Sequence, residues 1–365
     1  MMNPAIALIL VSAAGPKAQV QWRVPLPPGT TQLRYAANSQ LNALWDARSG
    51  GVMWNSIYRD KWRVFWFDPL RRKVVPMGEG SFGEPQIDCD LGLATVQRYN
   101  PTTKTETGET YSLSTGKLLS TVTGRPKRVG RFVMTRDSKF DLDTWTDAVT
   151  GKVLWQGEAV YRGPMTERPP PRSPIWITPK RWLLINGKGG QLASDKKDVV
   201  DVQPGTWKEL QRSYLSDHAM WFDGIIGDPE SGTFAVFEAT SRSSHSTGIF
   251  RSDLTRVPGR FLNVTDITQY GILDREGKPM MNGDIDFDTI VCADATTGKV
   301  KWRASSKEPG RWVGSNVLTG DRLLNGKTGR LLGKLKLPRL LAVGRDGTFV
   351  GIDGETLVGG RIRAR

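Results

Sequence analysis

Cysteine and histidine are both scarce in this sequence, with two of each among its 365 residues. Cys89 and Cys292 lie too far apart for a metal-binding motif, and the sequence leaves open whether they pair or remain buried thiols. His218 follows Asp217 and His245 lies among serines, but no G-x-S-x-G motif supplies a nucleophile for a catalytic triad. No glycine-rich stretch has the spacing of a phosphate-binding or dinucleotide-binding loop. These absences exclude the common hydrolase, nucleotide-binding and zinc-binding residue sets.

The sequence also has no hydrophobic run long enough to cross a membrane as a helix, which needs about 20 residues. An apolar segment at 5–11 is followed by the small residues Ser12 and Ala14, as in a secretory signal peptide that is cut before Gly15. No Lys or Arg begins this segment, and no cysteine follows the cut to carry a lipid anchor. We expect residues 1–14 to be a signal peptide and the mature protein to be exported, periplasmic or extracellular.

Acidic residues are fewer than basic ones: the sequence has 37 Asp and Glu and 51 Lys and Arg, which gives a formal net charge of +14. The basic residues are scattered, with the densest groups at 71–73, 125–131, 196–197 and 361–365. None forms a helical stripe or a zinc-finger spacing, so a nucleic-acid partner is not expected. The pattern favours a solvated basic surface, with an acidic glycan or lipid surface as the alternative partner.

Apolar and turn-forming residues are abundant. The sequence is 38% hydrophobic and has 13 Trp, 12 Phe, 40 Gly and 22 Pro. This composition is typical of an ordered globular protein. Many glycines beside many aromatic residues favour short strands and tight turns over a helical bundle.

One segment recurs along the chain. Residues 140–155 (FDLDTWTDAVTGKVLW) and 287–302 (FDTIVCADATTGKVKW) are identical at nine of sixteen positions. A looser copy, DARSGGVMW, occupies 46–54, and a related segment repeats at 184–193 and 323–332. Weaker copies begin at 112 and 228. Such self-similarity indicates a repeat architecture, in which stacked units bury a shared core.

The repeat predicts a hairpin turn followed by a strand. Its first residue is expected to accept hydrogen bonds from backbone N–H groups of the turn, and its glycine to take a positive φ at a bulge. Strand alternation then places Val300 and Trp302 on one inward face. The tryptophans are expected to fill the space between neighbouring units. The residues concerned are Asp46, Gly50 and Trp54; Asp147, Gly151 and Trp155; Asp294, Gly298 and Trp302; and Asn325 with Gly329.

The spacing of the copies predicts the architecture. A unit of roughly 35 to 45 residues with several short strands is the size of a propeller blade. Residues 20–365 then form seven or eight four-stranded blades, and we favour eight. Because two gaps exceed one unit, some copies are expected to mark a different hairpin within a blade. The tail 346–365 is expected to pair with the N-terminal segment and close the ring, and the proline-rich segment 167–174 is expected to be a loop.

The motif D-A-x-T-G-K-x-x-W, best at 147–155 and 294–302, resembles the repeat of the PQQ-type (quinoprotein-like) β-propellers. The resemblance implies an all-β fold, a single β-propeller domain over residues 20–365. It covers both cofactor-bearing alcohol dehydrogenases and cofactor-free scaffolds, such as the outer-membrane assembly lipoprotein of Gram-negative bacteria. The dehydrogenases are longer and carry two adjacent cysteines above the quinone, a pair that this chain lacks. We therefore expect no bound quinone.

One acidic stretch is a candidate metal site. Asp284, Asp286 and Asp288 alternate, so on a strand all three would lie on one face, where a cation such as Ca²⁺ would relieve their repulsion. Asp141 and Asp143 form a shorter version. A solvent-facing strand edge without metal explains the same pattern.

The sequence favours a non-catalytic function. We expect an exported β-propeller that acts as a binding or scaffold module for a protein or a cell-envelope component, through its faces and loops. The alternative is a quinone-dependent or other enzyme that uses the central channel of the propeller.

Overall fold

The computed structural model describes the residues that follow: 15–26, 30–31, 44–46, 51–58, 61–68, 71–79, 86–88, 91–100, 102–129, 131–137, 142–158, 172–177, 182–187, 197–202, 209–216, 221–228, 231–240, 243–281 and 285–363. Every regular element in this part of the chain is a β-strand. The all-β class predicted from the repeat is confirmed.

The described strands form eight antiparallel sheets, numbered here in chain order. Sheet 1 contains β2 (Thr30–Thr31), β3 (Leu44–Asp46), β4 (Gly51–Tyr58), β5 (Lys61–Asp68) and β6 (Lys73–Glu79). Sheet 2 contains β7 (Gln86–Asp88), β8 (Leu93–Asn100), β9 (Thr105–Ser112) and β10 (Leu118–Thr123). Sheet 3 contains β11 (Arg125–Val129), β12 (Phe132–Asp137), β13 (Leu142–Asp147) and β14 (Val153–Glu158). Sheet 4 contains β15 (Arg172–Ile177), β16 (Trp182–Gly187), β17 (Lys197–Val202) and β18 (Glu209–Ser216).

The second half of the chain repeats the pattern. Sheet 5 contains β19 (Trp221–Gly227), β20 (Thr233–Thr240) and β21 (Ser243–Arg251). Sheet 6 contains β22 (Asp266–Thr268), β23 (Gly271–Pro279), β24 (Ile285–Ala293) and β25 (Val300–Ser305). Sheet 7 contains β26 (Gly310–Val313), β27 (Asn316–Thr319), β28 (Arg322–Asn325) and β29 (Leu331–Lys334). Sheet 8 contains β30 (Arg339–Val343), β31 (Thr348–Asp353), β32 (Thr356–Arg363) and, from the other end of the chain, β1 (Lys17–Pro25).

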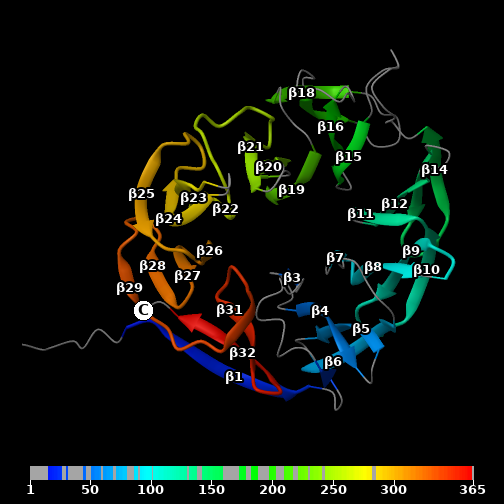
Figure 1. The fold of residues 1–365 in the computed structure, drawn as a ribbon, viewed down its shortest axis with the longest axis horizontal. Helices are drawn as coiled ribbons and strands as arrows, with labels where there is room; N and C mark the ends of the chain where they lie inside the picture. The colour runs from blue at the N-terminus through cyan, green and yellow to red at the C-terminus, as the bar shows by residue number, and fades with distance from the viewer. Residues whose placement is uncertain are drawn as a thin grey trace, which may run out of the picture.

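The sheets follow one another around a ring (Figure 1). First strands such as β22 and β26 lie toward its middle, and last strands such as β25 and β29 lie at its periphery. Neighbouring first strands are in contact along much of the ring, including β19 with β22, β22 with β26 and β3 with both β7 and β30.

The first and last described strands meet in sheet 8. β1 pairs antiparallel with β32, from Lys17 opposite Arg363 to Pro25 opposite Thr356. The prediction that the tail pairs with the N-terminal segment is therefore confirmed. Trp22 on β1 stacks on Phe67 of sheet 1 with ring centroids 4.5 Å apart, so β1 also joins the last sheet to the first.

The hydrophobic core lies between sheets rather than within one layer. One cluster joins Phe65 and Phe67 of sheet 1 to Val350 and Leu357 of sheet 8, and another spans sheets 6 and 7 around Trp302. Strands sandwiched in this way bury consecutive residues, as β8 does from Leu93 onward. Each sheet therefore depends on its neighbours for burial, as the repeat predicts.

The expected four strands are present in six of the eight described sheets. In sheet 1 both β2 and β3 pair with β4, which makes five strands. Sheet 5 has three, so the four-strand prediction is wrong there. After β21 the chain makes only an isolated bridge, Phe250 with Arg256, and then reaches Pro258, which has no N–H to continue a strand.

The repeat copies mark more than one kind of hairpin, as expected from their uneven spacing. The copies that begin at 147, 294 and 325 lie between the third and fourth strands of their sheets. The copy that begins at 228 lies between the first and second strands of its sheet, and the copy that begins at 46 lies between β3 and β4. The proline-rich segment is a loop in our prediction, but its last residues, Arg172 to Pro174, pair in β15. An edge strand tolerates proline because one row of its N–H groups has no partner.

Candidate functional site

Three copies of the repeat form the same turn. The Oδ1 atom of Asp294 accepts hydrogen bonds from the N–H groups of Thr296 and Thr297, at 3.0 and 2.9 Å. The Oδ1 atoms of Asp147 and Asn325 accept equivalent bonds at 2.9 to 3.1 Å. The glycines of the three turns, Gly151, Gly298 and Gly329, have φ values of 70°, 70° and 69° and donate their N–H to the carbonyl of the first residue.

A β-bulge follows each of these turns. Cys292 pairs with Trp302 and Ala293 with Val300, so Lys301 is the extra residue. The bulge changes the alternation, and Trp302 is 7% exposed while Val300 is 46% exposed. Our prediction that Val300 faces inward with Trp302 is therefore wrong. The same register shift occurs in β10, β14 and β29, whose first residues are the exposed Leu118, Val153 and Leu331.

Trp302 joins its own sheet to the next one. Its Nε1 donates a hydrogen bond to the carbonyl of Gly326, 2.8 Å away in the turn between β28 and β29. A Cβ at Gly329 would lie 2.8 Å from the indole ring, so the glycine lets the ring pack directly on this turn. Trp312 on β26 bonds in the opposite direction, from its Nε1 to the carbonyl of Gly271, at 3.1 Å. Two buried indoles thus hold sheets 6 and 7 together.

Other sheets make this contact with different residues, which our sequence reading missed. Ser120 stands at the Trp302 position of sheet 2 and donates its hydroxyl to the carbonyl of Ala148, the counterpart of Gly326. Pro76 stands there in sheet 1, and a Cβ at Gly116 would lie 3.1 Å from its carbonyl oxygen. Counting four residues on from the turn glycine would have identified Ser120.

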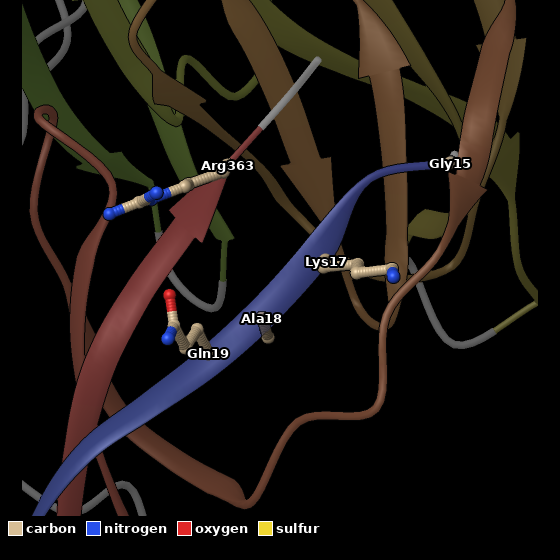
Figure 2. Close-up of a pocket in the computed structure, with 5 residues that line it drawn as sticks. All are labelled: Gly15, Lys17, Ala18, Gln19 and Arg363. Atoms are coloured by element: carbon tan, nitrogen blue, oxygen red, sulfur yellow. The ribbon is translucent and has the colours of Figure 1, made fainter. Parts of the chain in front are cut away.

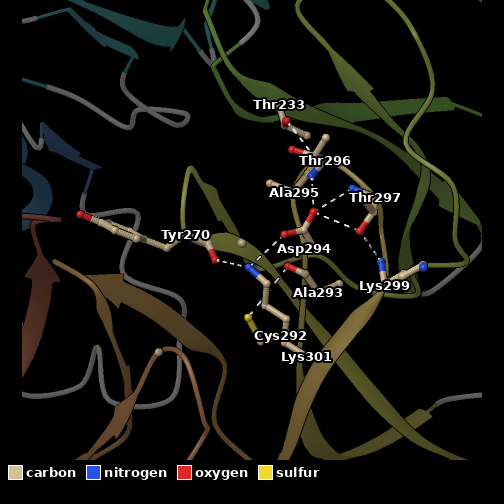
Figure 3. A network of polar contacts seen from close by, with 12 residues as sticks. Thr233, Tyr270, Cys292, Ala293, Asp294, Ala295, Thr296, Thr297, Lys299 and Lys301 are labelled. Atoms are coloured by element: carbon tan, nitrogen blue, oxygen red, sulfur yellow. Dashed lines mark hydrogen bonds and ion pairs between the residues drawn. The ribbon is translucent and has the colours of Figure 1, made fainter.

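Figure 3 shows how the polar residues of one turn are used. The Nζ of Lys301 lies 3.1 Å from the Oδ2 of Asp294 and 3.1 Å from the carbonyl of Tyr270. The N–H of Thr297, together with Lys301, lowers the pKa of Asp294 to about 2. The hydroxyl of Thr233, in sheet 5, donates to the carbonyl of Ala295, so this turn also contacts the preceding sheet. These polar groups stabilise the turn and its docking.

The remaining repeat residues are described in part. Asp46 ends β3, and Gly50 lies outside the described residues. Only the backbone is described for Trp54, on β4, and for Trp155, which pairs with Trp145. Their packing stays a prediction.

Only part of the candidate calcium site lies within the described residues. Asp284 lies outside the described residues, while Asp286 and Asp288 lie two apart on β24. Asp286 pairs in register with Lys278, and Asp288 accepts a hydrogen bond from the hydroxyl of Thr289 at 2.8 Å. Within the described ranges, no group of three or more His, Cys, Asp or Glu side chains could hold a metal ion. Calcium binding therefore stays a prediction.

The scarce cysteines and histidines occupy ordinary positions where they are described. Cys292 is a free, buried thiol on β24, and burial raises its pKa to about 11, which keeps it protonated and unreactive. Cys89 and His218 lie outside the described residues. His245 is on β21, opposite Glu238.

Asp274 is a buried carboxylate that the sequence reading did not single out. It is 3% exposed on β23 and accepts hydrogen bonds from the N–H groups of Leu262 and Asn263, at 2.9 and 2.6 Å. Burial raises its pKa to about 6 in spite of these bonds. It anchors the connection from sheet 5 to sheet 6. The sequence signal for its burial is that Asp274 directly follows two apolar residues in a strand.

A pocket of about 340 Å³ lies where the chain ends meet, lined by Gly15, Lys17, Ala18, Gln19 and Arg363 (Figure 2). Lys17 and Arg363 are opposite each other in the β1–β32 pair. Their side chains point to different sides of the pocket in Figure 2, so the two cations do not converge on one ligand. In the part of the chain that is described, no helix has the length and apolarity to cross a membrane.

No protein-family model and no curated protein matches the sequence. Among solved structures, BamB from Moraxella catarrhalis is 11% identical, with a TM-score of 0.55 over 94% of this chain and 99% of that one. An uncharacterized protein from Listeria monocytogenes EGD-e is 12% identical, with a TM-score of 0.49 over 88% and 98%. The quinohemoprotein alcohol dehydrogenase from Comamonas testosteroni is 11% identical, with a TM-score of 0.46 over 95% and 77%. The likeness to BamB shows the fold alone: the chain is an all-β protein of the β-propeller type.

Proposed function

We propose that residues 20–365, with β1 as first strand, form a single closed PQQ-like propeller of eight blades. The eight described sheets, their order around the ring and the β1–β32 pair support this count. We further propose that residues 1–14 are a signal peptide and that the mature protein is periplasmic or extracellular.

We propose that this propeller is a non-catalytic binding module for a protein partner in the cell envelope. Its repeat residues are used to hold sheets together: Asp294 stabilises a turn, and Trp302 binds the turn of the next sheet. A ring tied in this way is a rigid support for loops and hairpins, on which propellers carry their binding residues. The BamB-like fold favours a protein partner.

The hairpin of β23 and β24 carries this proposal. β25 pairs with β24 only from Thr289 onward, and β22 pairs with β23 only as far as Leu273. The outer part of the hairpin therefore extends beyond both flanking strands. Met280 and Met281 follow β23 near its tip and are 50% and 109% exposed. Flexible, polarisable methionines suit protein contacts, and exposed apolar tips are unfavourable in water unless a partner covers them.

Photo-crosslinking in the native cells tests the binding role. A photoreactive residue at Lys278 or Asp286 flanks the methionines on the paired strands. We expect an adduct of one defined mass, and we expect Met280→Lys with Met281→Lys to abolish it. The matched control is Val300→Lys, because Val300 is an exposed aliphatic residue on a different part of the same sheet. No adduct at either position would overturn the proposal.

A fluorescence titration tests the enzymatic alternative. Pyrroloquinoline quinone with Ca²⁺ is added to the mature protein, whose Trp residues report binding. We expect no saturable quenching after correction for absorption by the quinone. Saturable quenching at micromolar quinone would replace the scaffold proposal by that of a quinone-dependent enzyme.

A further inference from the structure

Sheet 5 ends one strand short of its neighbours. Its order is β19–β20–β21, whereas sheet 6 adds β25 outside β24 and sheet 4 adds β18 outside β17. β21 pairs with β20 along its whole length, from Ser243 to Arg251. Its other edge therefore lies where the fourth strand of a blade would be.

The described part of the chain covers only one end of this edge. The N–H of Val257 donates to the carbonyl of Ile249, and the N–H of Arg251 donates to the carbonyl of Thr255. Beyond Val257, the chain turns toward sheet 6, where the carbonyl of Pro258 would collide with a Cβ at Gly298. Residues 243–248 of β21 have no backbone partner on this side within the described part of the chain. Six residues of strand give an edge of about 20 Å that no described strand covers, and Gly248 at its end is buried.

The sequence of this edge is unusual for a strand edge that no described strand covers. Residues 243–248 read SSHSTG, without a proline or a Lys, Arg, Asp or Glu side chain. Charged residues and proline are the usual means by which exposed edges avoid pairing with other chains. The outer strands β6 and β25 carry such residues, among them Pro76 and Lys301. Among the described residues, no strand pairs with this edge of β21, and the edge carries none of these protective residues.

The fold already accepts a fourth strand from a distant segment. In sheet 8, β30, β31 and β32 come from the C-terminus, and the strand that completes the sheet is β1, from the N-terminus. A sheet of three consecutive strands in this protein is therefore completed by an added antiparallel strand.

We propose that the outer edge of β21, residues 243–248, binds an extended segment of a partner protein as an antiparallel fourth strand. The partner segment is uncharged or weakly charged, because no charged side chain on the edge selects its sequence. Main-chain hydrogen bonds provide most of the affinity in such strand addition. This inference rests on the proposed binding function and names a second contact for the partner.

A peptide with the sequence of residues 118–123 tests it, because this segment is β10, an uncharged fourth strand of the same protein. Hydrogen–deuterium exchange is measured on the full mature chain with and without about 1 mM peptide, a concentration that detects even weak binding. We expect exchange of the amides at 243–248 to slow about tenfold. Those of β25, an outer strand of a complete sheet, serve as the internal control and should not change.

The matched control peptide carries proline in place of Ser120 and Val122 and cannot form the ladder, while its charge is unchanged. Protection of 243–248 by the first peptide alone supports the proposal. No protection, or equal protection by both peptides, overturns it. Protection that rises with protein concentration and without peptide overturns it in favour of a second copy of this chain. If the peptide does not protect the edge but the methionine-dependent adduct still forms, the binding function stands and only the strand-addition proposal is rejected.

Discussion

The indole of Trp302 donates its N–H to the carbonyl of Gly326, and this bond of 2.8 Å joins the last strand of one sheet to a turn of the next. The same indole packs on Gly329 in that turn. Sheet-to-sheet attachment thus combines a buried aromatic ring, one hydrogen bond and the absence of a side chain at one glycine. Each component can be removed separately.

Replacement of the ring should be costly. Trp302→Ala removes a large buried side chain and should lower the free energy of unfolding by about 3 to 5 kcal/mol. Trp302→Phe keeps most of the packing, but it leaves the Gly326 carbonyl without its donor and should lose about 1 to 3 kcal/mol. Urea denaturation measures both. Val300→Ala, at an exposed site in the same strand, should stay within about 0.5 kcal/mol. Equal losses for Trp302→Ala and Val300→Ala would refute the docking role.

Gly329→Ala tests the close approach. Gly329 has a φ of 69°, and an added Cβ would lie 2.8 Å from the Trp302 ring. Backbone strain of about 1 to 2 kcal/mol and an overlap of about 1 to 3 kcal/mol should add. Gly354→Ala is the matched control, because Gly354 has a φ of 62° and no atom within 4 Å of its Cβ position. The difference between the two variants in thermal unfolding measures the overlap, and no difference would mean that the ring moves freely.

The stability that Asp294 contributes should depend on pH in the acidic range. Its pKa is lowered to about 2, chiefly by the N–H of Thr297, so the ionised carboxylate is favoured by folding. This stabilisation is present above the unfolded pKa of about 3.9 and is lost as the pH falls toward 2. Asp294→Ala should reduce stability near neutral pH by about 1 kcal/mol. The wild-type and variant unfolding curves should converge below pH 3, and a constant difference would contradict this account.

The contribution of Asp274 to stability should change with pH in the opposite direction. Its pKa is raised to about 6 by burial, so folding disfavours the ionised form. The stability contribution is greatest below the unfolded pKa and is lost as the pH rises through 6, a change of about 3 kcal/mol for two units. Relative to Asp274→Asn, the wild-type protein should gain stability between pH 6 and pH 4. Chemical denaturation at several pH values measures the difference, and a flat profile over this range would rule out a buried titrating carboxylate.

The sequence predicts the turns better than the strands that leave them. Asp147 and Asp294 were assigned correctly as turn residues because carboxylate-to-amide bonding is local and depends on few positions. The inward orientation predicted for Val300 is wrong, because a bulge adds one residue to the strand and strict alternation of side chains does not allow for it. The described residues that follow β21 form no fourth strand in sheet 5, because Pro258 docks near Gly298 in a contact between different sheets.

The contacts between sheets were predicted only where they use an aromatic residue. Ser120 reaches the same kind of carbonyl as Trp302, because that carbonyl accepts a hydrogen bond from any donor of suitable reach. Asp274 was missed for a related reason, since its partners are backbone N–H groups that leave no side-chain pattern.

The pairing of β1 with β32 has a consequence for how the protein is made. β1 cannot find its place until β32 exists, so this sheet joins two strands that lie more than 300 residues apart in the sequence. Contacts this distant slow folding, and an incomplete chain exposes two edges in the meantime. Because Lys17 and Arg363 are paired in one sheet, a circular permutant that links them and begins at another turn should fold through more local contacts, with the same final structure.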